Sequence, residues 1–556
     1  MTMKNSKRGV DPQGPPATDE IRITPAHVAE AAERLRDYKA GKQILDARLA
    51  DEMSWWHGRY GREGRAGYGN STSAWLFNSI AHKHADLCDN YPVCRALPRE
   101  ARDEQEAAML SAILPVIVER CDFEKIYSDN GWSKLKHGMA GYGVFWNPAL
   151  ENGFGDIDVR RVDVANLYWA PGVSDIQESP HLYLVSLEDT ESLVSRYPML
   201  AEQEIMSRSG AVPDTGGSYL AGSESTRGKT AVVDWYYKVT RPDGRTLLHY
   251  AKLVGETLLY ASENDPLYAD RGWYDHGQYP FVLDVFFPRE GTPEGYGLIS
   301  VGRNAQGYID ELDGRLMEYA NWASRVRYWA KRSLGVNEQD FLDLDRHIVE
   351  VEGDIDEEKL KQITLSPMDG ALAELRKMKI EELKETTGTK DVSLGGTSGG
   401  VTAASAITAL QEAGEKSSRD CLAGTYRAYV QIMRQVIELI RQFYDSARTF
   451  RICGAEEGKY SYLTYSNRGI TDQVNGERRD GEISYYRPVF DIDVKAEKQS
   501  PHSRAERNRL MLSLYESGML DEGRERAALR ALEGMEFEGA SALRASLQAA
   551  IGGPEG

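Results

Sequence analysis

The chain has 556 residues, of which 41% are hydrophobic and 28% are charged, and its formal net charge at pH 7 is −19. This composition is typical of a folded protein and excludes a disordered chain, and the length corresponds to roughly two to four domains. The acidic balance argues against a protein that wraps nucleic acid by neutralising phosphates, because such proteins need clustered Lys and Arg.

The N-terminal segment, residues 1–20, is predicted to be a disordered tail. Its sequence, MTMKNSKRGVDPQGPPATDE, has no apolar core and does not fit a secretory signal. The chain has no run of about 18 or more apolar residues, so no membrane span is expected. The five cysteines are odd in number and scattered, which predicts a reducing cytosol and no disulfide framework.

Residues 21–139 are predicted to be helical. Thr24 and Pro25 have the pattern of a helix N-cap followed by proline at the first helical position. Helices are expected at 26–40, 43–57, 74–88 and 100–139. Gly41 is expected to separate the first two of them, and the Asn-Tyr-Pro sequence at 90–92 to end the third.

Residues 140–295 change character and are predicted to form a mainly β region. Segments rich in β-branched and aromatic residues alternate there with turn signals, as in VVDWYYKVT at 232–240 and FVLDVFF at 281–287. One helix is expected within this region, near 188–208. GMAGYG at 138–143 is interpreted as a helix C-cap and a turn into a strand, because its glycine spacing is not that of a dinucleotide-binding loop.

The remainder of the chain is predicted to return to helices at residue 298. In chain order we expect a helix at 298–332, an excursion at 333–367, a second helix at 370–385, a glycine-rich loop at 386–402, a long helix at 403–450, a strand-rich segment at 451–500 and a pair of charged helices at 501–550. The long helix carries aromatic and aliphatic residues at spacings of three and four, which predicts a core-facing seam.

The loop at 386–402 is the most informative segment of the chain. It reads TTGTKDVSLGGTSGGVT, with five glycines and no aromatic residue. Glycine tolerates backbone angles that other residues avoid, so this loop can bend sharply or stay mobile. The helices predicted on both sides favour a functional loop mounted on rigid elements, and a plain linker between domains is the alternative.

The segment GSESTRGKT at 222–230 resembles a phosphate-binding loop at first sight. That motif has four residues between its glycines and is followed by a helix, whereas here five residues separate Gly222 from Gly228 and a strand pattern follows. A surface loop before a strand is therefore the favoured interpretation. A nucleotide-hydrolysing enzyme that uses this segment, with Lys229 on the phosphates, is kept as the alternative function.

Two further patterns concern metal binding and catalysis. His82, His84, Cys88 and Cys94 fall within one short stretch and include residue types that bind zinc, but no Cys-x-x-Cys pair anchors them, so ordinary packing is favoured and no metal is expected. The chain has no Gly-x-Ser-x-Gly sequence that would place a nucleophile, and no spacing of carboxylates indicates an acid–base pair. We therefore expect neither catalysis nor a cofactor.

The order and wording of several segments over about 75–530 resemble the portal proteins of tailed bacteriophages and prophages. These segments are HKHADLCDNYPVCRALP at 82–98, GMAGYGVFW at 138–146, VDVANLYWAPGVSDIQESPHLYLVSLEDTESLVSRYP at 162–198, GYGLISVGRNAQGYIDELDGRL at 295–316, LGGTSGGVTAASAITALQEAGEKSSRD at 394–420 and FYDSARTFRI at 443–452. No single segment defines the family, and their occurrence together in this order is what carries the resemblance.

The resemblance implies an α+β portal fold and a ring, a dodecamer, at one vertex of the capsid, with a channel for DNA packaging and ejection. The family's parts would lie at 21–295 (wing), 298–332 and 370–385 (stem helices), 333–367 (clip), 386–402 (tunnel loop), 403–450 (long wing helix), 451–500 (wing β segment) and 501–550 (a crown-like helical end). Localisation in the virion after assembly in the host cytoplasm follows from the same resemblance.

The resemblance also implies partners and a candidate site. The partners would be further copies of the chain, the terminase large subunit, the major capsid and scaffolding proteins, a head–tail connector or adaptor, and double-stranded DNA that passes without sequence specificity. The tunnel-loop residues expected to face the DNA are Thr389, Lys390, Asp391, Ser393, Thr397 and Ser398. Besides the hydrolase, a ring-forming or scaffold protein of non-viral origin is the remaining alternative.

Overall fold

The structure is a computed structural model that describes residues 22–60, 73–203, 228–242, 244–324, 327–330, 360–363, 370–388, 416–453, 460–477, 483–498, 501–516 and 524–534. The tail predicted at 1–20 lies outside these residues. The chain folds into two compact units, here called the first unit (1–53, 80–300 and 391–556) and the second unit (54–79 and 301–390). Each unit is described by itself. The fold is a mixture of helices and open sheets, as the sequence predicts.

Helix α1 (Pro25–Tyr60) is one continuous helix, so the prediction of two helices separated by Gly41 is wrong. Glycine lowers helix stability by roughly 1 kcal/mol relative to alanine but does not by itself end a helix. Here it has a packing role, because a Cβ atom on Gly41 would lie 2.5 Å from Cγ of Pro171. The glycine therefore allows Pro171 to approach the helix backbone.

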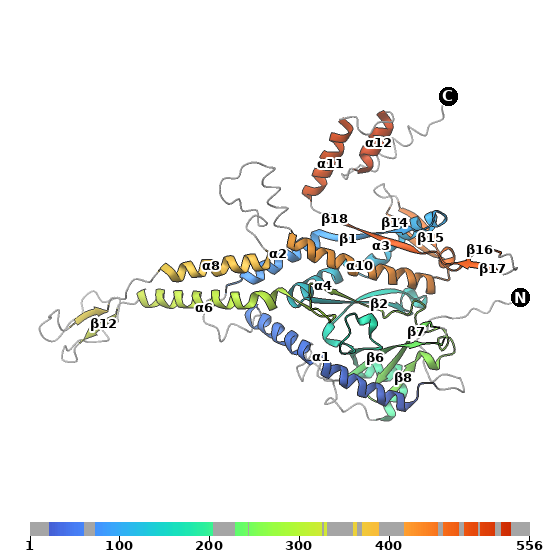
Figure 1. The fold of residues 1–556 in the computed structure, drawn as a ribbon, viewed down its shortest axis with the longest axis horizontal. Helices are drawn as coiled ribbons and strands as arrows, with labels where there is room; N and C mark the ends of the chain where they lie inside the picture. Colours follow the sequence, from blue (N-terminus) through green and yellow to red (C-terminus); the bar gives the residue numbers. More distant parts are fainter. Residues whose placement is uncertain are drawn as a thin grey trace. The chain divides into compact units, whose positions relative to one another are not determined.

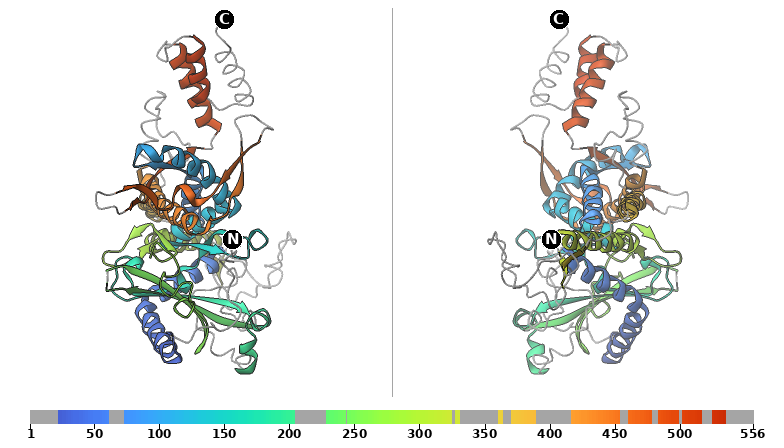
Figure 2. Two further views of the ribbon diagram at one scale, coloured as in Figure 1. Left: turned by 90° about the vertical axis from the view of Figure 1, so that its right-hand side faces the viewer. Right: turned by 90° about the vertical axis from the view of Figure 1, so that its left-hand side faces the viewer.

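A five-stranded antiparallel sheet packs against α1 in the first unit. Its strands follow one another in chain order: β4 (Leu167–Trp169), β5 (His181–Asp189), β6 (Lys229–Thr240), β7 (Thr246–Val254) and β8 (Thr257–Ala261). Val28, Ala31 and Leu35 of α1 share one buried cluster with Tyr183 and Trp235 of the sheet. Figures 1 and 2 show α1 lying along this sheet.

A second sheet of the first unit has the order β3-β2-β9, with β3 (Asp156–Val162), β2 (Met139–Asn147) and β9 (Phe281–Val285). The expected mainly β character of 140–295 is confirmed, and the short pair β10 (Phe287–Pro288) and β11 (Gly295–Tyr296) ends the region. The helix expected near 188–208 is shorter within the described residues: α5 covers Thr190–Arg196 and a 3-10 helix follows at Pro198–Gln203. Tyr197 separates α5 from Pro198 and has a non-helical backbone, which fits the rule that the residue before a proline is driven out of helical geometry.

The region 74–139 contains a strand that the helical prediction missed. Helix α2 (Trp75–Asp89) is followed by β1 (Asn90–Pro98), which pairs with β18 (Phe490–Lys498) in a two-stranded antiparallel sheet. Proline is tolerated in such an edge strand because an edge leaves N–H positions unpaired. The predicted helix at 100–139 is two helices, α3 (Glu104–Arg120) and α4 (Phe123–His137), since Asp122 adopts a left-handed backbone with φ of 51°.

Gly138 caps the C-terminus of α4, as the sequence predicts, and turns the chain into β2 with φ of 86°. The backbone of residues 295–297 crosses the chain at this point. A Cβ atom on Gly138 would lie 2.2 Å from the carbonyl carbon of Tyr296, and one on Gly297 would lie 2.1 Å from the carbonyl oxygen of Lys136. Two backbones therefore meet with no side chain between them, immediately before the chain enters its next helix.

Helix α10 (Lys416–Phe443) forms the core of the first unit together with β2, β9 and the β1–β18 pair. Tyr429, Met433, Val436 and Ile440 lie buried on one side of it, which confirms the predicted seam. The elements after α10 are the strand pairs β14 (Arg448–Cys453) with β15 (Tyr460–Tyr465) and β16 (Gln473–Glu477) with β17 (Ile483–Tyr486), then α11 (Pro501–Glu516) and α12 (Arg524–Gly534).

The second unit contains two long helices. The described parts are most of α6 (Leu298–Ser324), the antiparallel pair β12 (Arg327–Ala330) and β13 (Leu360–Ile363), and α8 (Gly370–Thr387). The prediction of one helix over 298–332 is wrong at its end, because residues 327–330 form a strand. The aromatic residues Tyr328 and Trp329 favour a strand, and pairing with β13 satisfies the backbone there.

Candidate functional site

The helices α6 and α8 of the second unit are joined by specific contacts and form a hairpin with the β12–β13 pair between them in the chain. The Arg376 guanidinium of α8 contacts both carboxylate oxygens of Asp313 of α6, with Nη2 donating to Oδ2 at 3.2 Å and Nε to Oδ1. The Lys379 ammonium lies 5.3 Å from the ring centre of Tyr308. A bidentate arginine–carboxylate pair fixes orientation as well as distance, so it sets how the two helices align.

A buried amide ties α6 to the residues that precede α2 within the same unit. Gln306 is fully buried, and its Nε2 donates to the Ser73 carbonyl at 3.0 Å and to Asp310 Oδ1 at 2.9 Å. Its Oε1 accepts the Leu76 backbone N–H at 2.9 Å. Both the amide nitrogen and the amide oxygen of this side chain have partners, and these hydrogen bonds fix α6 against residues 73–76.

Several large apolar side chains of the hairpin are exposed. On α6 these are Val301, Tyr308 and Met317, and on α8 they are Leu375 and Met378, with Met378 61% exposed. Large exposed apolar side chains are candidates for contacts with other molecules when they form a contiguous patch.

The predicted loop residues Thr389, Lys390, Asp391, Ser393, Thr397 and Ser398 all lie between 389 and 415, outside the described residues. The start of this segment is anchored. Thr387, which is 1% exposed, donates from Oγ1 to the Leu383 carbonyl at 2.8 Å, and the same oxygen lies 3.2 Å from Ser79 Oγ. Gly388 then takes a left-handed backbone with φ of 70°, the usual way in which a helix ends.

The helix that follows this segment, α10, is anchored by a fully buried ionic network that the sequence did not reveal. Lys134 of α4 donates from Nζ to Asp284 Oδ1 of β9 at 2.7 Å, to the Cys421 carbonyl at 2.9 Å and to Thr425 Oγ1 at 2.7 Å. Thr425 Oγ1 also donates to Asp284 Oδ2 at 2.9 Å. All three ammonium protons therefore have acceptors, which is the condition for keeping a charged lysine in a core. No spacing in the sequence links residues so far apart.

The described end of the segment 222–230 is a strand and not the helix that follows a phosphate-binding loop. Residues 222–227 lie outside the described residues, and Lys229 is the first residue of strand β6, where it pairs with Asp189. A phosphate-binding loop needs a helix N-terminus at this position, because the free backbone N–H groups hold the phosphates. The structure therefore contradicts the basis of the nucleotide-hydrolase alternative.

His84 and Cys88 come together on α2, whereas Cys94 lies elsewhere. Cys88 Sγ is 3.7 Å from His84 Nε2, and the His84 ring stacks on Trp132 at 4.5 Å. Cys94 on β1 accepts the Tyr429 hydroxyl at 3.8 Å, and burial raises the pKa of its thiol to about 11. In the part of the chain that the structure describes, no group of three or more His, Cys, Asp or Glu side chains could hold a metal ion.

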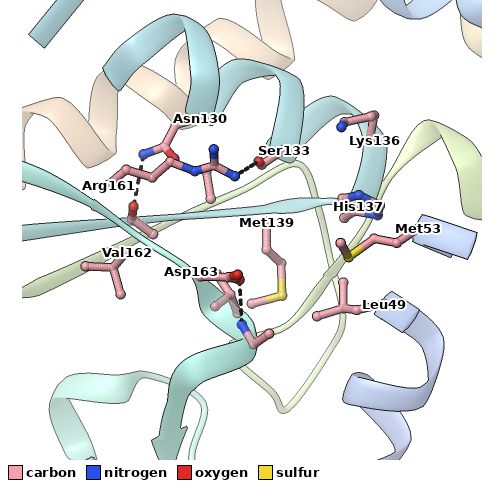
Figure 3. A pocket seen from close by; sticks show the side chains of 14 residues that line it. Leu49, Met53, Asn130, Ser133, Lys136, His137, Met139, Arg161, Val162 and Asp163 are labelled. Carbon is pink, nitrogen blue, oxygen red and sulfur yellow. Dashed lines mark hydrogen bonds between the residues drawn. The ribbon is translucent and has the colours of Figure 1, made fainter. Parts of the chain in front are cut away.

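A small cavity of about 50 Å³ lies among residues of α1, α4, β2 and β3, and Figure 3 shows its lining. Ser133, His137 and Asp163 all line it, but their hydrogen bonds lead away from one another. Ser133 accepts Arg161 Nη2 at 2.8 Å, His137 Nδ1 lies 3.0 Å from Glu52 Oε2, and Asp163 accepts the backbone N–H of its own turn. This cavity can hold water, and it does not assemble a nucleophile with a base.

Comparison with known proteins finds one family model that matches part of the chain. A family model described as Phage P22-like portal protein matches residues 296–555, which begin just before α6 and include the hairpin, α10 and the C-terminal strands and helices. Among solved structures, a chain of the virion of native gene transfer agent (GTA) particle matches with 10% identity and a TM-score of 0.40, over 88% of this chain and 94% of that chain. No curated protein matches the sequence.

Among the helices that the structure describes, none is long and apolar enough to cross a membrane. The family match agrees with the resemblance drawn from the sequence motifs over residues 296–555, which contain the motifs at 394–420 and 443–452 and all but the first residue of the motif at 295–316. The chain is therefore similar, over residues 296–555, to the Phage P22-like portal protein family.

Proposed function

We propose that the chain forms a dodecameric ring at one vertex of the capsid and that the ring is the channel through which DNA is packaged and ejected. The observation that carries this proposal is the family match over the hairpin and the segments that follow it. The exposed apolar side chains of α6 and α8, such as Tyr308 and Met378, support it. Neighbouring copies in a ring would bury these groups, because burying apolar surface drives subunit association.

The hairpin corresponds to the stem of the portal ring, and the residues between its helices to the clip. Because α6 ends at Ser324, we place the boundary between stem and clip there and not at 332. The wing comprises 21–295, α10 and the strands of 451–500, and the C-terminal helices form a crown-like end. The clip is rich in Asp and Glu over 341–358, and we assign to it the docking of the terminase large subunit and later of a head–tail connector.

The acidic charge of the chain suits a channel that DNA passes without binding tightly. A ring of twelve chains carries about −228 formal charges, twelve times the −19 of one chain, and DNA carries one negative charge per ~1.7 Å of its axis. Charges more than ~10 Å apart are largely screened at 0.1 M salt. The wall therefore repels the duplex weakly and offers few sites at which it can stop.

We assign the remaining contacts with DNA to the loop at 386–402, which follows α8. Lys390 is positioned in the sequence to touch phosphates, next to Asp391, while Thr389, Ser393, Thr397 and Ser398 offer uncharged contacts. Major capsid and scaffolding proteins would bind the outer parts of the ring during assembly in the host cytoplasm.

Negative-stain imaging of the purified full-length chain tests the ring. Rings of twelve or thirteen subunits with a central hole are expected, and particles that stay monomeric or grow into open filaments would contradict the proposal. A second experiment tests the role of the loop independently of ring formation. Replacing residues 388–400 by a short rigid turn should leave rings intact and impair packaging or retention of DNA, and normal packaging by this variant would overturn the role of the loop.

A further inference from the structure

A charged groove of about 570 Å³ lies in the first unit, outside the hairpin and the loop. We call it the arginine groove. It is lined by Arg99, Asp275, His276, Gln278, Arg434, Gln435, Ile437, Glu438, Arg441, Arg487, Val489, Phe490 and Asp491. These residues come from α10, the end of β1, the start of β18 and the turn before β9. The volume falls in the range of about 300–1,000 Å³ that is typical of ligand sites.

Three of the four arginines in the groove already have partners. Arg99 pairs with Asp491 at 2.7 Å, Arg487 pairs with Asp472 at 2.7 Å, and Arg441 pairs with Glu438 and donates to the carbonyls of Ile470 and Pro488. Arg434 differs from them. It is exposed and makes no hydrogen bond or ion pair with any residue that the structure describes, although, after the hydrogen bond from Arg99, its charge helps to lower the pKa of Asp491. The donors of this guanidinium are therefore available to an incoming anion.

The residue next to it supplies an unused acceptor. Gln435 is only 4% exposed and donates from Nε2 to the Tyr279 carbonyl at 3.0 Å. Its Oε1, in contrast, has no hydrogen-bond partner within the described ranges. A buried acceptor left unpaired costs roughly 1–3 kcal/mol, so a donor that displaces its covering groups and reaches this oxygen relieves that cost.

We propose that the arginine groove binds an acidic, extended segment of a partner protein. A carboxylate of the segment pairs with Arg434, and a backbone N–H donates to Gln435 Oε1. This pairing of an anion with a nearby N–H is available along any extended peptide that contains Asp or Glu. Binding to the groove does not depend on the proposed ring, because all lining residues belong to one chain.

The carboxylates of the groove favour a peptide over a nucleic acid. Four arginines and three carboxylates (Asp275, Glu438 and Asp491) line it, which leaves a net charge of only +1. A phosphodiester backbone brings a charge at every residue and no backbone N–H group that these carboxylates or Gln435 Oε1 could accept. A peptide brings N–H groups that the same carboxylates can accept, so the mixed lining suits it.

The test uses the full-length chain and a fluorescein-labelled, N-acetylated peptide of ten residues in which Glu and Ala alternate. Fluorescence anisotropy should show binding that weakens at least about tenfold when Gln replaces Glu in the peptide, as expected for loss of charge-assisted hydrogen bonds. Arg434→Glu should weaken binding of the Glu peptide to a similar extent. Arg427→Glu is the matched control: it makes the same charge change on an exposed residue of α10, seven residues earlier and outside the groove, and should change the affinity less than about twofold.

Three outcomes would overturn the proposal. Equal losses in the Arg434→Glu and Arg427→Glu variants would show a general charge effect. Tighter binding of a labelled ten-nucleotide oligothymidine than of the Glu peptide would assign the groove to nucleic acid. Absence of peptide binding, together with a change in subunit number on Arg434→Glu, would show that the groove is a contact between copies of the chain.

Discussion

The first unit and the hairpin of the second unit differ in the contacts that hold their elements together. In the first unit, the five-stranded sheet buries Tyr183 and Trp235 against α1, and α10 buries Met433 and its neighbours along its seam. Large apolar side chains are exposed in both units, for example Phe154 in the first and Met378 on the hairpin. The units differ in what holds their elements together: the first unit has extensive buried clusters, whereas the described hairpin buries few apolar residues, such as Ile309 and Leu383, and is aligned by the Arg376–Asp313 pair. Stability and assembly should therefore respond to substitutions in different places.

The largest loss of stability is expected from breaking the buried network of the first unit. Lys134→Ala leaves Asp284 charged and without its partner in the core, which should lower the free energy of unfolding by about 3–5 kcal/mol. Urea denaturation followed by circular dichroism measures this loss. Lys125→Ala removes an exposed lysine of the same helix and should change stability by less than about 0.5 kcal/mol. A similar small change for Lys134→Ala would show that the network does not hold α10.

The next largest effect is expected from a residue of the first unit whose contribution to stability depends on pH. Burial lowers the pKa of His249, on β7, to about 4, so the folded state keeps this ring neutral. The unfolded state binds a proton near pH 6.5, and the contribution of the ring to stability is therefore present above about pH 6.5 and lost as the pH falls toward about 4.

His249→Gln keeps a polar side chain beside Ser262 and cannot titrate, so the variant should lose less stability than the natural chain between pH 6.5 and 4. The difference should reach about 1–2 kcal/mol, after allowance for relaxation around the ring. Thermal melts at a series of pH values measure it, with His27→Gln on the exposed start of α1 as the control. Parallel curves for the natural chain and His249→Gln would exclude this residue as a source of acid sensitivity.

A smaller effect is expected for the contact that aligns the hairpin. Arg376 and Asp313 are partly exposed, so solvent screens their attraction, and Arg376→Ala should cost about 1 kcal/mol or less. A double-mutant cycle with Asp313→Ala isolates the pair, and a coupling energy near zero would mean that the two side chains act independently.

The smallest effect on folding is expected where the effect on assembly is largest. Met378→Glu places a charge on the exposed face of α8 and should change the melting stability of a single chain by less than about 0.5 kcal/mol. The same change should prevent ring formation, because a charge would be buried at each contact. Sedimentation velocity measures assembly, and Met378→Leu, which keeps the apolar volume, should still form rings. Ring formation by Met378→Glu would remove this face from the subunit contact.

Local patterns in the sequence predicted the elements whose signals are local. The seam of α10 follows from the spacing of its apolar residues, and the C-cap at Gly138 from a glycine between a helix and a strand. Gly41 was wrongly predicted to end a helix. Its role is to let Pro171 approach the helix backbone, and Pro171 is too far along the chain for a local pattern to show this. The strand at 327–330 was missed because its partner, Leu360–Ile363, is non-local and a continuing helical pattern hid it.

The sites could be predicted only in part, for the same reason. A glycine-rich loop is visible in the sequence and suggested where DNA contacts would lie, although those residues fall outside the described structure. The arginine groove was not visible, because Arg99, Asp275, Arg434 and Arg487 are brought together only by folding. The network of Lys134 with Asp284 and Thr425 joins three elements and has no signature in the sequence at all.

The backbone crossing at Gly138 and Gly297 bears on how such a chain can change over evolutionary time. Most core positions tolerate gradual exchange, since a neighbouring side chain can shrink when another grows. At this crossing the neighbours are main-chain atoms within 2.2 Å of any added Cβ, and they cannot be exchanged. We expect both positions to remain glycine among descendants that diverge elsewhere, so that this pair outlasts most of the sequence around it as a mark of common descent.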